Sequence, residues 1–461
     1  MVSPNSQVSV KEKIGYGFGD FASSMFWKLF SVYLMIFYTD VFGISAAAVG
    51  TMFVVTRLWD SVNDPIMGII ADRTETKWGK FRPYLMWGAI PFALIGILTF
   101  TTPDISQSNK LIYAYVTYTM MMMAYTAVNV PYASLLGVMS SNSSDRTALA
   151  SFRMVFAFAG SIFAFILIEP LLDIFSNIGG EENAKVGWTL TIAVYGAIAA
   201  VLFYLTFAWT KERIAPPKNQ EDNLGEDAKS LLKNVPWFVL LGASLCTLVF
   251  NSLRDGAAVF YFKYTFENQD IALFGMSLSL ITTYLVAGQV ANIVGVMLAQ
   301  PISDRIGKRS TFICAMLLAT VLSGLFYFLD ESQLLNIIIL QCCISACAGI
   351  IFPLMWSMYA DIADFAEHSS GRRATGLIFS SSSFAQKMGW TFGGAVTGWL
   401  LAFYGYEANQ IQSEETKQGL RLMVSVFPAI GAAMSAGFML QYKLTENVMD
   451  EVHTELAERR K

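Results

Sequence analysis

Long apolar runs recur along the whole chain and dominate what it can fold into. Residues 33–37 lie within the first run, and residues 238–250 lie within a later one. A helix that crosses the hydrocarbon core of a bilayer needs about 20 mainly apolar residues, because that core is about 30 Å thick. The runs have this length, and we therefore expect an all-α membrane protein.

Composition argues against a soluble protein. Apolar residues make up 54% of the 461 residues and charged residues only 14%, whereas about 25% of the residues in a typical soluble domain are charged. The formal net charge of −4 argues against nucleic acid as a partner. The five cysteines fall inside apolar runs, and no paired histidines or activated nucleophile accompany them. We therefore expect no disulfide framework, no cofactor and no enzymatic activity.

We expect twelve transmembrane helices, separated mostly by short connections. Their approximate bounds are 14–38, 45–71, 82–101, 110–138, 147–172, 188–210, 233–263, 273–302, 310–329, 334–360, 373–404 and 417–442. One longer connection is polar and charged and contains a Pro-Pro pair. The expected organisation is an N-terminal six-helix half (1–210), a cytoplasmic linker (211–232), a C-terminal six-helix half (233–442) and a cytoplasmic tail (443–461).

Lysine and arginine are unevenly distributed among these connections. Most of them lie near the chain ends and in the connections that follow even-numbered spans. Basic residues accumulate on the cytoplasmic side of membrane proteins. We therefore expect both termini to be cytoplasmic, in a multi-pass protein of the bacterial inner (cytoplasmic) membrane.

Two short basic turns occupy matching places in the two halves. Asp72-Arg73 follows the second span and Asp304-Arg305 follows the eighth, each with a glycine and further basic residues after it. On this repeat the chain resembles the major facilitator superfamily, which implies two pseudo-symmetric six-helix halves. These four residues are candidates for salt bridges that latch the cytoplasmic side. The alternative is that the basic turns only anchor the chain at the membrane surface.

The second span carries three charges on one helix face. Arg57, Asp60 and Asp64 stand at i, i+3 and i+7, and the two aspartates are one turn, about 6 Å, apart. Arg57 can neutralise one carboxylate, so the second requires a cation or a proton. Asn63 and, on the fourth span, Thr126 could supply further oxygen atoms. The cluster therefore predicts a site for Na⁺ or H⁺, and a purely structural cluster is the alternative.

Polar residues of the first, fourth and fifth spans suggest a ligand site. Asp20 follows closely spaced glycines, and an ionised carboxylate can accept strong hydrogen bonds from sugar hydroxyls. Arg153 is its expected partner, and a structural Asp20–Arg153 bridge is the alternative. Asn129 can donate to and accept from a neutral ligand, and Tyr132 lies on the same span.

Five motifs, taken together, resemble the glycoside-pentoside-hexuronide:cation symporters, the family that includes the melibiose permease. The motifs are GYGFGDFASSMFW, RLWDSVNDPIMG, DRTETKWGKFRPY, NVPY and DIADFAEHSSGRRATG. The resemblance covers the whole chain. It implies that Asp60 and Asp64 bind sodium, lithium or protons, assisted by Asn63 and Thr126. It also implies that the sugar-binding residues include Asp20, Arg153 and Lys387.

The chain departs from the melibiose permease on the fourth span. Asn129 stands where the galactoside transporter has a second sugar-binding aspartate, and Ala133 stands where it has a tryptophan. The cation site is thus expected to be intact, while galactoside specificity is not implied.

Several cations could favour an acidic sugar such as a hexuronide. These further candidate contacts are Lys28 on the first span, Arg254 on the seventh, and Lys387 with Trp390 on the eleventh. Lys28 could instead pair with an aspartate or extend to the interface. Asp361 and Asp364, near the expected end of the tenth span, are candidates for gating or structure.

The expectation from sequence is a monomeric symporter that takes up a sugar, glycoside or hexuronide together with Na⁺ or H⁺. Two alternatives remain open at this point. One is a facilitator-fold transporter of another solute, such as a lysolipid, and the other is a non-transporting membrane sensor.

Overall fold

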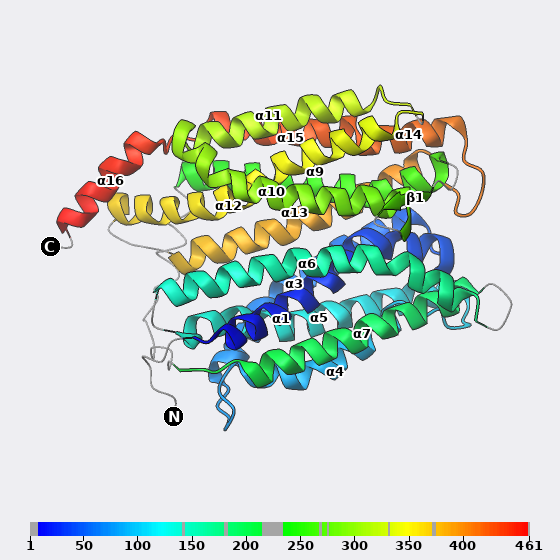
Figure 1. The fold of residues 1–461 in the computed structure, drawn as a ribbon, viewed down its shortest axis with the longest axis horizontal. Helices are drawn as coiled ribbons and strands as arrows, with labels where there is room; N and C mark the ends of the chain where they lie inside the picture. The colour runs from blue at the N-terminus through cyan, green and yellow to red at the C-terminus, as the bar shows by residue number, and fades with distance from the viewer. Residues whose placement is uncertain are drawn as a thin grey trace. The chain divides into compact units, whose positions relative to one another are not determined.

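A computed structural model describes residues 8–140, 143–178, 183–213, 234–266, 270–273, 276–330, 332–370 and 375–459. The chain divides into two compact units, Met1–Gln220 (unit 1) and Glu221–Lys461 (unit 2). The division falls within the segment 211–232 that the sequence marks as a linker. Figure 1 shows the units coloured from blue to green and from green to red along the chain.

Unit 1 consists of long helices. They are α1 (Val10–Lys28), the π-helix η1 (Leu29–Tyr33), α2 (Leu34–Ile36), the π-helix η2 (Phe37–Phe42), α3 (Ala46–Arg73), α4 (Arg82–Thr99), α5 (Gln107–Met139), α6 (Ser143–Ser176) and α7 (Ala184–Trp209). Helix α1 packs against α6 and α7, α3 packs against α5, and α4 packs against α5 and α7. These contacts bring the polar faces of α1, α3, α5 and α6 into one bundle.

Unit 2 is also mainly helical. Its elements are α9 (Val235–Thr265), β1 (Asp270–Leu273), β2 (Met276–Ser279), α10 (Leu280–Ile306), α11 (Lys308–Phe326), α12 (Leu334–Ser370), α13 (Thr375–Phe403), α14 (Glu414–Val424), α15 (Val426–Leu440) and α16 (Glu446–Arg459). Helix α9 packs against α13 and α15, while α12 packs against α10 and α11. Small and aliphatic side chains, such as Ala243, Ala348 and Ile351, fill its core.

Most of these helices suit a bilayer. In the described part of the chain, ten helical segments are long and apolar enough to cross a membrane. Helices α3 and α13, of 28 and 29 residues, bring the number of long helical segments to twelve, in line with expectation. Large apolar side chains such as Leu94, Val201 and Leu317 are exposed, as suits helices that face lipid rather than water.

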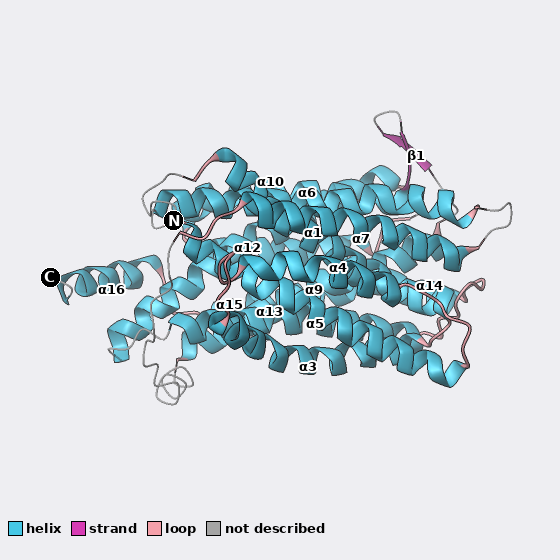
Figure 2. Ribbon diagram, turned by 90° about the horizontal axis from the view of Figure 1, so that it is seen from below, coloured by secondary structure: helices cyan, strands magenta, loops and turns pink. Residues whose placement is uncertain are grey.

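Four local features differ from expectation. The strands β1 and β2 form an antiparallel hairpin (Figure 2), which pairs Asp270 with Ser279 at its open end. The hairpin occupies the first residues of the expected eighth span, 273–302, and the residues just before it. The tenth helix continues to Ser370 because its polar end keeps helical spacing. The twelfth span is interrupted at Ser425, whose φ and ψ of −123° and −82° are not helical. The tail forms α16, which packs against α12.

The closely spaced glycines of α1 admit aromatic side chains from three other helices. A Cβ atom at Gly19 would overlap the ring of Tyr132 on α5, and one at Gly17 would lie 2.7 Å from the ring of Phe156 on α6. Gly15 is approached equally closely by a tryptophan of α7. The glycines therefore bring the polar residues of α1 and α5 close together.

A carboxylate clip joins α4 to the end of α7 in unit 1. Glu212 accepts hydrogen bonds of 2.8, 2.8 and 2.9 Å from three successive backbone N–H groups, those of residues 80–82. Gly79 has a φ of +110°, and a Cβ there would lie 2.6 Å from that carboxylate. The Arg82 side chain donates to the Phe207 carbonyl oxygen at 2.6 and 3.2 Å. The turn thus both caps α4 and holds the last turn of α7.

Unit 2 repeats this carboxylate clip between α11 and α16. Glu446 accepts a hydrogen bond of 2.5 Å from the backbone N–H of Lys308. Gly307 has a φ of +84°, and a Cβ atom there would overlap the Glu446 carboxylate, as a Cβ atom at Gly79 would overlap the Glu212 carboxylate. The Arg309 side chain donates to the last carbonyl groups of α15, at 2.6 and 3.3 Å. The repeated glycine and basic residues of the sequence therefore have a shared role within each unit.

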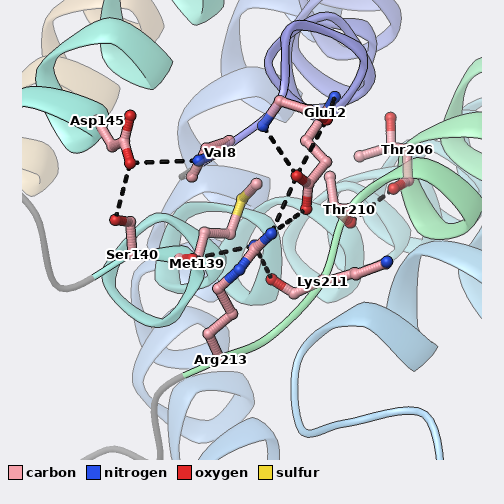
Figure 3. Close-up of polar contacts among 10 residues, drawn as sticks. Val8, Glu12, Met139, Ser140, Asp145, Thr206, Thr210, Lys211 and Arg213 are labelled. Carbon is pink, nitrogen blue, oxygen red and sulfur yellow. Dashed lines mark hydrogen bonds and ion pairs between the residues drawn. The ribbon is translucent and has the colours of Figure 1, made fainter. Parts of the chain in front are cut away.

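A second polar cluster fixes the start of α1 (Figure 3). Arg213 donates to both carboxylate oxygens of Glu12, at 2.8 and 3.0 Å, and to the Met139 carbonyl oxygen at 3.2 Å. Asp145 accepts from the Val8 backbone at 3.3 Å and from a serine at the end of α5. These contacts join α1, α5, α6 and the segment after α7.

Candidate functional site

The charges of α3 meet a hydroxyl group of α5. The Thr126 Oγ1 atom lies 2.9 Å from Asp60 Oδ1 and 2.9 Å from Asp64 Oδ1. Arg57 donates from Nη1 to the other Asp60 oxygen, Oδ2, at 2.9 Å. The predicted i, i+3, i+7 face is thus formed, and its partner on α5 is the threonine expected from sequence.

The charge of this cluster is not balanced by its own residues. Arg57 is paired with Asp60, so Arg57, Asp60 and Asp64 together carry one more negative than positive charge when both carboxylates are ionised. The Thr126 hydroxyl carries one proton and can donate to one of the two carboxylates at a time. A second hydrogen bond, across the other 2.9 Å contact, forms when that carboxyl group is protonated. The cluster is therefore suited to a monovalent cation.

Burial strengthens the electrostatics of the cluster. Arg57, Asp60 and Thr126 are at least 95% buried, where a low dielectric strengthens interactions between charges. The ring of Trp27 lies 4.7 Å from the Arg57 Cζ atom, which adds a cation–π contact. Asn63 is half-buried, and the structure brings no hydrogen bond between it and the cluster among the described side chains.

The expected pair on α1 and α6 is present. Arg153 donates from Nε to Asp20 Oδ2 at 2.8 Å, and both side chains are partly exposed. The ring of Tyr132 lies 5.2 Å from the Arg153 Cζ atom. Tyr132 stacks on Tyr16, with ring centroids 4.8 Å apart. The Tyr132 hydroxyl donates to the backbone carbonyl oxygen of Tyr16 at 2.7 Å. The aromatic pair thereby fixes the position of the ion pair.

Helix α5 links the two clusters. Asn129 lies three residues after Thr126, on a neighbouring part of the same face. Its side-chain nitrogen donates to the Tyr125 carbonyl oxygen at 3.1 Å, which leaves its amide oxygen available as an acceptor. Asn129 is half-buried, so a ligand that contacts it can also influence the cation cluster one turn away.

The first helix changes geometry next to a buried lysine. Lys28 ends α1 and is followed directly by η1. Its Nζ atom lies 5.8 Å from the ring of Phe165. π-Helical segments are frequent at functional sites, and the role of Lys28 as a substrate contact stays a prediction.

The candidate contacts of unit 2 lie on α9 and α13. Trp390 accepts a 2.8 Å hydrogen bond at its carbonyl oxygen from Ser252, which packs α13 against α9. Lys387, one turn earlier on α13, is half-buried. Arg254 is 96% buried on α9, and the rings of Tyr284 and Phe326 flank it.

Residues near the end of α12 make polar contacts within unit 2. Asp361 accepts from Lys308 at 2.6 Å, and His368 lies 2.7 Å from Glu455 on α16. Asp364 is half-buried nearby on α12. Sequence analysis places these positions near the end of the tenth span, and the structure shows that they are helical.

The candidate latch residues lie at the ends of α3 and α10. Arg73, Asp304 and Arg305 are exposed, and no ion pair involves them among the described side chains. The side chain of Asp72 lies outside the described residues. The latch therefore stays a prediction.

Sequence reasoning missed two aromatic residues of the site. Trp27 lies against Arg57, and Tyr16 lies under Tyr132. Trp27 follows Asp20 by seven residues and Tyr16 precedes it by four, so helical spacing could have indicated that all three share a face.

Comparison with known proteins identifies relatives along almost the entire chain. Residues 15–446 match the family described as MFS/sugar transport protein. The inner membrane symporter YicJ of Escherichia coli K12 is 35% identical over 454 residues, which cover 98% of this chain and 95% of that protein. The putative glycoside/cation symporter YagG of the same organism is 35% identical over 456 residues, covering 99% and 96%.

A solved structure shares the architecture. The major facilitator superfamily transporter FucP, in its outward conformation, matches with a TM-score of 0.58 and 14% identity. The match covers 95% of this chain and 99% of FucP. At this identity the likeness establishes the major facilitator fold alone.

Proposed function

The chain belongs to the MFS/sugar transport protein family, and on that premise we propose that it takes up a sugar or glycoside together with Na⁺ or H⁺. Family membership makes the protein a multi-pass membrane transporter. The printed description of YagG, a glycoside/cation symporter, supports the choice of substrate and coupling ion.

The observation that carries the proposal is the contact of one Thr126 hydroxyl with two carboxylates. Asp60 and Asp64 each lie 2.9 Å from it, and Arg57 balances one of their charges. We assign the coupling ion to this cluster, with Asn63 as a further ligand reached after a local rearrangement. Either a proton or Na⁺ can offset the second negative charge of this cluster.

The sugar is assigned to the second cluster of unit 1. The Asp20 carboxylate can accept hydrogen bonds from sugar hydroxyls, Arg153 can donate to them, and the Tyr132 ring offers an apolar face. The Asn129 amide, one turn from Thr126, can both donate hydrogen bonds to the sugar and accept them from it. Lys28 of unit 1 and Lys387, Trp390 and Arg254 of unit 2 remain candidate contacts.

Coupling follows from shared elements. Helix α5 carries Thr126 of the cation cluster and Asn129 of the sugar cluster, so a ligand at either site restrains the same helix. A cation that raises sugar affinity must be bound more tightly, by the same factor, when the sugar is present. In this superfamily, transport proceeds largely by rocking one half against the other, and we propose the same here, with cytoplasmic termini and a monomeric unit.

Vesicle uptake tests the proposal. A panel of neutral glycosides, pentosides and hexuronides is offered with an inward Na⁺ gradient, an inward H⁺ gradient or no gradient. We expect accumulation of one class under one gradient, and its loss in Asp64→Cys with normal membrane insertion. Uptake that ignores both gradients and survives the substitution would make the α3 cluster structural.

A further inference from the structure

Trp27 joins the first helix to the helices that form the cation cluster. Its ring centroid lies 4.7 Å from the Cζ atom of Arg57 on α3 and 5.6 Å from the ring centroid of Tyr125 on α5. Tyr125 directly precedes Thr126, and its carbonyl oxygen accepts the 3.1 Å hydrogen bond from Asn129. One side chain of α1 therefore contacts both helices that hold the cluster.

The same face of α1 carries the carboxylate assigned to the sugar. Asp20 and Trp27 stand at i and i+7, two helical turns and about 10 Å apart along the axis. Helix α1 runs without interruption from Val10 to Lys28, so a displacement of one side chain carries the other with it. Arg153 of α6 donates to Asp20 at 2.8 Å. The helix thus contacts the sugar cluster through one residue and the cation cluster through the other.

The packing of the helices makes this side-chain contact a direct link. Helix α1 packs against α6 and α7, whereas α3 packs against α5, and the Trp27 ring reaches from α1 to α3. Trp27 is half-buried, so packing does not enclose its ring on all sides. Arg57 is only 5% exposed. The ring can therefore shift, and the shielded guanidinium group must respond to it.

Arg57 controls how much of the Asp60 carboxylate is available to a coupling ion. It donates from Nη1 to Asp60 Oδ2 at 2.9 Å, while Asp60 Oδ1 lies 2.9 Å from Thr126. A cation that approaches Asp60 therefore meets the guanidinium charge on the same carboxylate. The face of a tryptophan ring attracts a guanidinium group, and the attraction is stronger when the pair is shielded from water. A ring that moves can thus take the guanidinium group with it.

We propose that Trp27 is a positioning residue that transmits sugar binding on α1 to the cation site. A sugar bound at Asp20 displaces this face of α1, and the Trp27 ring moves with it. The ring draws the Arg57 guanidinium group away from Asp60 Oδ2, which becomes free for the coupling ion. The inference rests on the proposed function and adds a route through α1 to the route through α5. By linkage, a cation on Asp60 favours the same ring position and so tightens sugar binding.

Calorimetry on the purified full-length protein measures the enhancement, which is the factor by which the coupling ion tightens sugar binding. The probes are methyl glucoside, methyl xyloside and methyl glucuronide. Each is titrated with saturating Na⁺ or at acidic pH, and choline at neutral pH is the reference. Wild type should show an enhancement of about 5- to 150-fold for one of these sugars. In Trp27→Leu it should fall below about twofold, while the affinity in choline stays within about threefold of wild type.

Two further variants separate this role from a purely structural one. Trp27→Phe keeps an aromatic ring with a weaker face and should show an intermediate enhancement. Trp87→Leu removes a tryptophan that is 47% exposed on α4 and should leave the enhancement at its wild-type value. A side chain that only fills space would change the stability, or both affinities equally, without changing the enhancement.

The enhancement in the Trp27 variants decides the inference. A wild-type enhancement in Trp27→Leu would overturn it, as would an enhancement in Trp27→Phe as small as that in Trp27→Leu. If Trp27→Leu does not fold, the full wild-type enhancement in Trp27→Phe would overturn it.

The wild-type protein separates the two proposals. Gradient-driven uptake together with an enhancement that survives Trp27→Leu leaves the symporter proposal standing and removes the role of Trp27. A wild-type protein that binds none of the three sugars, or whose sugar binding neither ion tightens, removes both.

Discussion

In unit 1 a turn wraps around Glu212, and in unit 2 the equivalent turn wraps around Glu446, with a positive-φ glycine in each. In the membrane-spanning parts the units differ. Unit 1 pairs its buried Arg57 with Asp60, whereas unit 2 buries Arg254 beside aromatic rings, with no ion pair among the described residues. The carboxylate clip is therefore a property of the repeated architecture. The charges in the spans are specific to each unit and indicate separate functions.

This contrast suggests a division of labour between the units. Unit 1 holds two carboxylates in contact with Thr126, which suits a cation, whereas in unit 2 the Nε and Nη2 atoms of Arg254 are buried without a hydrogen-bond partner among the described residues.

The largest expected effect concerns the two buried arginines. Arg57→Met removes the cation that balances Asp60, and breaking a buried pair on one side costs about 3–5 kcal/mol. Arg254→Met removes a cation with no ion pair among the described residues, so its effect on stability should be below about 1 kcal/mol or favourable. Thermal unfolding of both purified variants in detergent measures the difference. Equal losses of stability would contradict the distinction between a paired and an unpaired arginine.

A smaller effect is expected at the carboxylate clip. Glu212 accepts three backbone hydrogen bonds and Glu446 accepts one, so Glu212→Gln should lower the unfolding free energy by about 1–2 kcal/mol and Glu446→Gln by less. The same thermal unfolding measurement compares them. Glu414→Gln, at a side chain that is 89% exposed, provides the neutral control. A larger loss of stability for Glu446→Gln than for Glu212→Gln would contradict this ranking of the two clips.

Much of the fold follows from the sequence because apolar length sets helix length in a bilayer. The observed helices differ from the expected ones at places where the length of the apolar run does not determine the helix bounds. The residues 361–368 lie beyond the apolar run, but Asp361, Asp364 and His368 keep the spacing i, i+3, i+7, which signals a continued helix. The break at Ser425 sits inside an apolar run and changes no hydropathy signal, so only tertiary packing could reveal it.

The sequence likewise predicted only part of the candidate site. Arg57, Asp60 and Asp64 were recognisable because one helix presents them at fixed spacing. Thr126 and Arg153 were selected by their chemistry and supported by the family resemblance, but their contacts with α3 and α1 depend on which helices pack together. Glu212 and Glu446 were missed as clip residues because a carboxylate after a helix gives no indication of a distant backbone partner. The repeated glycine turns were the available clue.

The most direct test of the central claim measures how the cation and the sugar affect each other's binding. Calorimetry determines sugar affinity with and without a saturating cation, and cation affinity with and without sugar, for wild type, Thr126→Ser and Thr126→Val. The account predicts equal factors in both directions for wild type and Thr126→Ser. It predicts a cation affinity about 10- to 100-fold weaker in Thr126→Val. Cation binding that Thr126→Val leaves unchanged would contradict the assignment of the coupling ion to Asp60, Asp64 and Thr126.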